Sequence, residues 1–181
     1  AIQANLQALD LFTKIGDRHG EASVWANLAA CFQQTSQLEK GFDACERALK
    51  ISRDLGDLEG EANSLNTLAA LYEENLDYDK AQEALEMAAE INGKIEDRSG
   101  QATNFHNLGV IASILNDAEL AVTYLTLALE IRRQINDYHG TAKTILEIAK
   151  RIPDSDDSKT KQELLKEVRT LCQKYDLNII M

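Results

Sequence analysis

The sequence predicts an all-α fold, an α-solenoid of antiparallel helix pairs, on three observations. A seven-residue motif occurs four times, as GDRHGEA, GDLEGEA, EDRSGQA and NDYHGTA, and its aspartates and glycines recur every forty residues. The apolar residues between the motifs are spaced three and four apart, as on one face of a helix. The 181 residues include one proline and nine glycines, a composition that suits helices better than strands. A fixed period of this length is typical of stacked repeats, so each period is predicted to be one helix pair.

The motif is predicted to start the first helix of each unit. An aspartate at the N-cap accepts hydrogen bonds from backbone N–H groups that have no partner inside the helix. The helices are therefore predicted to begin near Arg18, Leu58, Arg98 and Tyr138. The glycines at the fifth motif position have two possible roles. They lie either in the first helical turn, where another helix crosses closely, or in a longer loop that needs a positive φ; they are Gly20, Gly60, Gly100 and Gly140.

The residue before each of these aspartates is predicted to end the preceding helix. Gly16 and Gly56 adopt the left-handed conformation without steric cost, and Asn136 does so at a small cost. Glu96 occupies the same place in the third motif, where its side chain makes this conformation expensive. The turn at Glu96 is therefore predicted to be the weakest of the four.

The period also divides the chain into segments. Residues 1–15 match the second helix of a truncated repeat, which suggests a piece of a longer protein. Three full units are predicted at 16–55, 56–95 and 96–135, and the first helix of a fourth unit at 136–152. Pro153 begins a polar insertion, 153–159, which is followed by a capping helix and tail, 160–181. Thr160 and Glu163 have capping-box spacing, so the last helix is expected from about Lys161 to Tyr175, and the tail LNIIM either folds back on the core or does not.

Each unit is predicted to bury one face of each helix. The first-helix faces are Ala22, Trp25, Leu28, Ala29, Phe32; Ala62, Leu65, Leu68, Ala69, Tyr72; and Ala102, Phe105, Leu108, Gly109, Ala112. The second-helix faces alternate small and large residues, which lets helix axes approach closely; they are Gly41, Ala44, Cys45, Ala48, Leu49; Ala81, Ala84, Leu85, Ala88, Ala89; and Ala121, Tyr124, Leu125, Ala128, Leu129.

Charge and composition restrict the classes of partner. The net charge is −11, from 30 acidic and 19 basic residues, which argues against nucleic acid, because a phosphate-binding surface needs clustered Lys and Arg. Basic or neutral protein partners are favoured. No segment approaches the length of a membrane span, so no membrane insertion is expected. Cys31, Cys45 and Cys172 are odd in number and lack CxxC spacing, which favours reduced, structural thiols in a cytoplasmic protein.

No motif of catalysis or metal binding is present. The three histidines are isolated in the sequence, and G-x-S-x-G, G-x-G-x-x-G and the phosphate-loop pattern are absent. The acidic run Asp154 to Asp157 resembles a calcium loop, but Lys159 and Leu165 stand where that loop needs Gly and Glu. We therefore expect neither an enzyme nor a cofactor.

The repeated residues resemble the tetratricopeptide repeat (TPR) family, whose pattern is a large residue, Leu, a small residue and an aromatic, then small, large and Ala in the second helix. The matching sets are Trp25-Leu28-Ala29-Phe32 with Gly41-Cys45-Ala48, Leu65-Leu68-Ala69-Tyr72 with Ala81-Leu85-Ala88, and Phe105-Leu108-Gly109-Ala112 with Ala121-Leu125-Ala128. Ala112 replaces an aromatic, and the usual Pro after the second helix is missing. Both departures fit a forty-residue sub-type similar to the spindle-orientation adaptors Pins and LGN and to kinesin light chains.

The resemblance implies a TPR superhelix whose first helices line a concave groove that binds a peptide or a partner helix. Its candidate binding residues are Asn27, Gln34, Asn63, Asn66, Glu73, Thr103, His106 and Asn107. Asn and Gln offer both a donor and an acceptor to a peptide bond, and Glu73 with Glu74 favours a ligand that carries Lys or Arg. The groove positions counted on the first three such helices carry no Lys or Arg, which argues against a clamp for a C-terminal carboxylate. Where LGN-like grooves carry Asn, this chain has Ala30, Ala70 and Val110.

Three functions remain open from the sequence. The first is a protein-binding module of a larger adaptor or scaffold protein. The second is a structural solenoid for self-association or for assembly of a multisubunit complex, and the third is a regulatory segment of a multidomain protein. His106 is either a ligand contact or an ordinary solvated side chain, whereas Trp25 and Phe105 are expected in the core.

Overall fold

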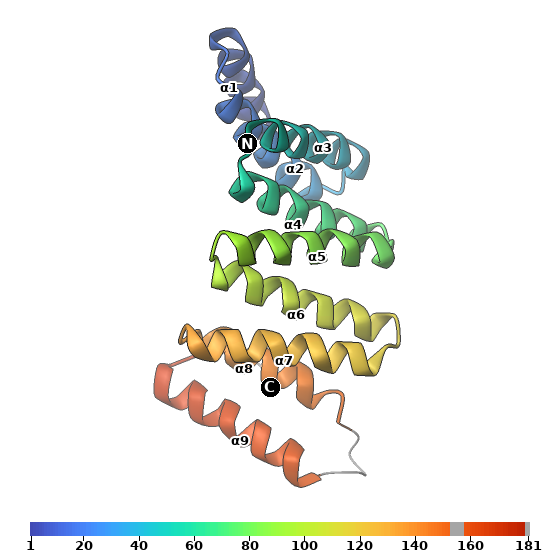
Figure 1. Cartoon of the computed structure of the whole chain (residues 1–181), viewed down its shortest axis with the longest axis vertical. Helices are drawn as coiled ribbons and strands as arrows, with labels where there is room; N and C mark the ends of the chain where they lie inside the picture. Colours follow the sequence, from blue (N-terminus) through green and yellow to red (C-terminus); the bar gives the residue numbers. More distant parts are fainter. Residues whose placement is uncertain (153–157, 180–181) are drawn as a thin grey trace. The chain divides into compact units, whose positions relative to one another are not determined.

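The computed structural model describes residues 1–152 and 158–179, and this part of the chain consists of nine α-helices joined by short turns (Figure 1). In order they are α1 Ile2–Ile15, α2 Arg18–Gln34, α3 Leu38–Leu55, α4 Leu58–Glu74, α5 Tyr78–Lys94, α6 Arg98–Ile114, α7 Ala118–Gln134, α8 Tyr138–Ala149 and α9 Ser158–Tyr175. The predicted all-α solenoid of helix pairs is confirmed.

The helices belong to two compact units, Ala1–Glu96 and Asp97–Met181, which we call unit 1 and unit 2. In unit 1, α2 packs on α3 and α4 on α5 as helical hairpins, and further contacts join α1 to α2, α3 to α4 and α2 to α4. In unit 2, α6 packs on α7, α7 on α8 and α8 on α9. Each first helix is therefore held by the second helix of its own hairpin.

The recurring aspartates cap the first helices as predicted. Oδ1 of Asp17, Asp57, Asp97 and Asp137 accepts a hydrogen bond from the backbone N–H three residues later, at 3.0, 2.9, 3.0 and 2.8 Å. The four helices begin at the predicted residues. An aspartate that the motif does not contain, Asp117, caps α7 in the same way through Leu120 N–H at 3.0 Å.

Left-handed residues end the helices at a regular spacing. Gly16 and Gly56 have φ values of 75° and 67°, and Asn136 has 58°, as predicted. Glu96 adopts φ 61° despite its side chain, at a steric cost of about 1–2 kcal/mol. The turns inside the hairpins use the same conformation, which the sequence did not indicate; their left-handed residues are Ser36, Leu76 and Asn116.

Of the two roles considered for the motif glycines, close packing is the correct one for Gly20, Gly60 and Gly140. They lie in the first turn of each helix, and none of them is among the residues with positive φ. A Cβ added at Gly20 would lie 2.3 Å from the Phe12 ring, and one at Gly60 would lie 2.6 Å from Ser52 Oγ. One at Gly140 would lie 2.7 Å from Arg132 Nε. The crossing side chain comes in each case from the residue eight positions earlier.

The predicted buried faces are largely confirmed. Leu28, Leu65, Leu85, Leu108 and Leu125 are among the largest fully buried side chains, and alanines pack between them. Cys45 is buried and donates to the Ser64 carbonyl at 3.0 Å, and its burial raises the pKa of the thiol to about 12. Cys45 is therefore a structural thiol with little thiolate at neutral pH.

The aromatic residues of the predicted buried faces are only partly buried; they are Trp25, Phe32, Tyr72, Phe105 and Tyr124. Trp25 is covered on one face by the guanidinium of Arg47, 4.8 Å from the ring centroid. Phe105 stacks on Tyr124 with the ring centroids 6.1 Å apart. Both lie at the edge of their hairpin, where a large ring packs against the partner helix and stays partly open to solvent.

The end of the chain differs from the expected boundaries. α8 ends at Ala149, four residues before Pro153, and α9 begins at Ser158. Thr160 therefore lies inside the helix, and its prediction as the N-cap of a capping box is wrong. Most of the predicted insertion, 153–157, lies outside the described residues.

α9 closes the apolar side of α8, as a capping helix should. Val168 is fully buried in a cluster with Leu129, Ala142 and Ile145. The tail residues Leu177 and Ile179 pack against the same cluster, so the tail folds back on the core as far as it is described.

Candidate functional site

The first-helix face of unit 1 carries most of the predicted binding residues. Asn27, Gln34 and Asn63 are exposed, and Asn66 and Glu73 are half-buried. Because α2 and α4 contact each other, a hollow of about 230 Å³ forms beside them. Asn27 lines this hollow, and the other lining residues are Ala22, Ser23, Ala26, Ser52, Asp57, Gly60 and Ser64. Their small and polar side chains leave space for one side chain or a stretch of backbone.

An acidic pair lies at the far end of this face. Glu74 accepts a hydrogen bond from Ser36 Oγ at 3.3 Å, which ties the end of α4 to the turn after α2. Burial raises the pKa of Glu73 above its usual value, because the half-buried carboxylate is poorly solvated. A cationic group placed there would restore the lost solvation, so this end of the face suits a Lys or Arg side chain.

Unit 2 contains a larger cavity, of about 620 Å³, between α8, α9 and the tail, with His106 of α6 at its edge. Its apolar walls come from Leu146 and Ala149 on α8, Leu165 on α9 and Ile179 in the tail. The volume is within the range of small-molecule sites.

The charged residues at this cavity are mostly basic. They are Lys143 and Glu147 on α8, Lys150 directly after it, and Lys161 on α9. Lys150 Nζ and Arg151 Nη1 each lie 2.9 Å from an oxygen of Glu147. Burial acts to raise the pKa of Glu147, but the hydrogen bonds from Lys150 and Arg151 outweigh it and lower the pKa. The carboxylate is therefore ionised and already neutralised by its own neighbours.

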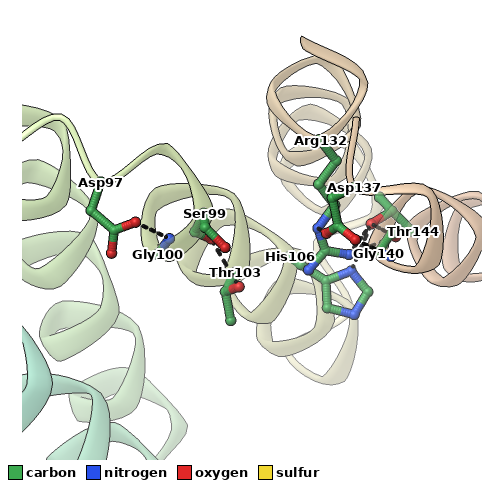
Figure 2. A network of polar contacts seen from close by, with 9 residues as sticks. All are labelled: Asp97, Ser99, Gly100, Thr103, His106, Arg132, Asp137, Gly140 and Thr144. Carbon is green, nitrogen blue, oxygen red and sulfur yellow. Dashed lines mark hydrogen bonds and ion pairs between the residues drawn. The ribbon is translucent and has the colours of Figure 1, made fainter. Parts of the chain in front are cut away.

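His106 connects the cavity edge to a buried polar network (Figure 2). Its Nδ1 lies 3.2 Å from Thr144 Oγ1, which also accepts from Arg132 Nη1 at 2.6 Å. Arg132 Nη1 donates further to the Gly140 carbonyl at 2.7 Å. Burial, with the positive charge of Arg132 second, lowers the pKa of His106 to about 4. The ring is therefore neutral at pH 7, and one imidazole nitrogen is a hydrogen-bond acceptor.

Two tetratricopeptide repeat models match residues 20–94 and 102–135, which together are more than half of the chain. The chain belongs to the tetratricopeptide repeat family. Its sequence matches none of the curated proteins with which it was compared.

Several solved structures share this TPR fold at low sequence identity. The apo form of RapI superimposes with a TM-score of 0.85 at 20% identity, over 96% of this chain and 48% of that one, so this chain spans about half of RapI. BtubC from P. vanneervenii gives a TM-score of 0.82 at 20% identity, over 96% and 72% of the two chains. TPR-like repeats of a putative kinesin light chain from Podospora anserina give 0.75 at 20% identity, over 98% and 88%. At these identities the likeness concerns the fold alone.

The predicted TPR groove residues are divided between the two units. Thr103, His106 and Asn107 belong to α6 in unit 2, and the other five belong to unit 1. The Thr103 hydroxyl donates to the Ser99 carbonyl at 3.0 Å (Figure 2). Asn107 is half-buried. His106 is the one of these three that lines the large cavity.

The groove positions counted in the sequence came only from the helices that are now α2, α4 and α6. The basic residues at α8 were therefore not among them. The groove positions of α2, α4 and α6 carry no Lys or Arg. The corresponding positions of the fourth unit carry Lys143 and Lys150, which line the cavity. The forty-residue frame would have indicated both, since they correspond to Thr103 and Val110. Leu165, Asn178 and Ile179 follow no repeat, so only the packing of α9 and the tail reveals them.

Two negative findings apply to the described residues. No three His, Cys, Asp or Glu side chains lie close enough together there to hold a metal ion. Within the same residues, no helix combines the length and the apolar character needed to cross a bilayer.

Proposed function

We propose that this chain is a protein-binding module that holds an extended segment or a helix of a partner protein on its first-helix face. The observation that supports this most strongly is in unit 1. There α2 and α4 contact each other, and polar residues at forty-residue spacing, such as Ser23 and Asn63, remain exposed beside the hollow that Asn27 lines. Exposed amides in a repeating row offer donors and acceptors to a partner backbone.

The finer features of the partner follow from the charges of this face. In unit 1 the amides and the half-buried Glu73 favour a neutral or basic segment, because its cation would relieve the poor solvation of that carboxylate. A role in an adaptor or scaffold protein, acting by binding rather than by catalysis, agrees with this surface. A cytoplasmic location is part of the proposal and agrees with the free thiols of Cys31, Cys45 and Cys172.

The test is affinity capture with the whole chain as bait. Asn27→Ala with Asn66→Ala removes two amides from the unit 1 face, and we expect the captured partners to bind roughly tenfold more weakly or to be lost. Gln3→Ala with Gln7→Ala is the matched control, because both glutamines are exposed amides on α1, away from this face. Unchanged partners for the Asn27 and Asn66 variant, with unchanged circular dichroism, would show that this face is not the binding surface.

One observation favours self-association as a second function. α1 has no buried residue, and Leu11 and Ile15, which lie one turn apart on the same face, are 61% and 73% exposed. An apolar helix face of this kind is a common site of association. Sedimentation of the wild type and of Leu11→Glu with Ile15→Glu tests it, since a concentration-dependent oligomer should become monomeric in the variant. A wild type that is monomeric at every concentration removes this candidate.

A further inference from the structure

We propose that the cavity of unit 2 binds a small anionic amphiphile, a carboxylate joined to an apolar chain. This site is separate from the protein-binding face proposed for unit 1. The proposal depends on three properties of the cavity, which are its apolar walls, the surplus of positive charge among its lining residues and its position between α8, α9 and the tail.

The apolar walls are continuous with the core of unit 2. Leu146 and Ile179 line the cavity and also pack against the buried cluster of Leu129, Ala142, Ile145 and Val168. A cavity wall held by the core keeps its shape without a ligand, so an apolar chain enters a largely preformed site.

The charge at the cavity is opposite to that of the whole chain. The protein has a net charge of −11, yet Lys143, Lys150 and Lys161 line one cavity with a single glutamate. That glutamate, Glu147, already has two cationic partners in Lys150 and Arg151. Lys143 forms no ion pair or hydrogen bond with any described residue. An anion in the cavity would therefore bind next to an ammonium group that pairs with none of the other described residues.

The lysines at the cavity suit an anionic head that is held by its charge rather than by bidentate geometry, and a carboxylate is the simplest such head. Lysine acts as a compact point charge, whereas arginine presents a planar fork for bidentate binding. Arg151, the nearby arginine, is occupied by Ser113 Oγ and by Glu147. The tail residues Asn178 and Ile179 bound the cavity opposite α8, which leaves space for a compact ligand.

The first experiment uses the whole chain and the fluorescent probe anilinonaphthalene sulfonate, an anion with an apolar body. We expect decanoate to displace the bound probe, and decylammonium, which has the same chain length and the opposite charge, to be at least roughly tenfold weaker. Shortening the carboxylate should weaken it roughly fourfold for each methylene removed. Equal displacement by decanoate and decylammonium, or no displacement by either, overturns the proposal.

The second experiment locates the binding. Lys143→Gln with Lys150→Gln should lower the affinity for decanoate roughly tenfold or more. Lys166→Gln with Arg169→Gln removes the same charge from exposed positions of α9 and should leave the affinity unchanged. Amide NMR shifts on adding decanoate provide a readout that does not depend on the variants. They should concentrate at Leu146, Leu165 and Ile179, and shifts confined to unit 1 would contradict the site.

The two proposals fail independently. Loss of decanoate binding in the lysine variant, with partner capture unchanged, supports the cavity and leaves the unit 1 face to its own test. Captured partners that depend on Asn27 and Asn66, together with no decanoate binding, leave the protein-binding function in place and remove the cavity ligand.

Discussion

Arg132 and Thr144 join α7 to α8 through a hydrogen bond buried in unit 2. Nη1 of Arg132 lies 2.6 Å from Thr144 Oγ1, and the arginine is only 7% exposed. Its Nε has no hydrogen-bond partner and lies 3.6 Å from Asp137 Oδ2. The equivalent positions in the two preceding repeats also hold buried polar residues, Ser52 and Asn92, whereas residues 1–15 have Phe12 there. The polar group at this crossing thus recurs in three repeats, and the arginine is its most demanding form because burial opposes its charge.

Replacing Arg132 by alanine should therefore destabilise the protein. The Gly140 carbonyl and the Thr144 hydroxyl lose a charged donor and a cavity remains, so we expect the free energy of unfolding to fall by about 3 kcal/mol. Arg133→Ala is the control, because Arg133 is exposed and pairs with Glu167 at 2.8 Å, and it should cost less than about 1 kcal/mol. Urea unfolding measures both.

A methionine at position 132 separates packing from hydrogen bonding. Asp137, the ionic partner of Arg132, is 36% exposed and stays solvated when the arginine is replaced, so Arg132→Met, which keeps the volume filled, should remain within about 1–2 kcal/mol of the wild type. A loss as large as that of Arg132→Ala would show that the hydrogen bonds, rather than the filled volume, hold α7 against α8.

His106 should make stability depend on pH. Its pKa is lowered to about 4 from an ordinary value of 6.5, chiefly by burial and then by the charge of Arg132. Between these values the unfolded chain binds a proton that the folded chain does not, so stability falls as the pH falls from 6.5 to 4 and then levels off. We expect a loss of about 2 kcal/mol after allowing for solvent screening.

Urea unfolding across this pH range measures the effect. His106→Gln should remove this part of the slope, whereas His139→Gln, at an exposed position, should keep it. NMR titration of the His106 ring gives the pKa directly. An ordinary value near 6.5 would contradict the burial of the ring against Thr144 and Arg132.

Gly109 should not tolerate alanine, although the equivalent residues Ala29 and Ala69 are alanines. A Cβ at Gly109 would lie 2.6 Å from Leu125 Cγ and 3.0 Å from the Ala121 carbonyl oxygen. Overpacking costs about 1–3 kcal/mol, and the better helix propensity of alanine returns about 1, so a net loss of about 1 kcal/mol is expected.

A double-mutant cycle in thermal or urea unfolding shows whether this contact is the cause. In a Leu125→Ala background only the 3.0 Å approach to the Ala121 carbonyl oxygen remains, so the loss caused by Gly109→Ala should become smaller. A loss of the same size in both backgrounds would place the steric conflict elsewhere.

The caps of the first helices should each contribute measurably. Asp97→Ala removes the acceptor of Gly100 N–H and should cost about 1 kcal/mol. Asp97→Asn keeps a side-chain oxygen at the same place and should cost less than half of that. Equal losses would mean that the charge at the helix start, rather than the hydrogen bond, is the stabilising feature.

The cavity of unit 2 shows which site residues the sequence can predict and which it cannot. The repeat frame locates Lys143 and Lys150 on the same face as Thr103 and Val110, and so predicts their side of α8. The opposite wall comes from Leu165 and Ile179, which lie after the last repeat and have no counterpart in it. The residues of a helix face that recurs in every repeat can be predicted from one repeat to the next. The residues of a cavity between elements that do not repeat cannot be predicted in this way.

The sequence by itself determined the helical repeat, the four capped starts and the buried faces. These depend on local hydrogen bonding and on a periodicity that each unit repeats, so Asp97 and Leu108 can be assigned without coordinates. Only the tertiary structure decided that Glu96 adopts a left-handed conformation, that Trp25 stays partly exposed and that His106 joins a polar network with Thr144 and Arg132. Those outcomes are set by how closely neighbouring helices approach, a distance that depends on every side chain between them.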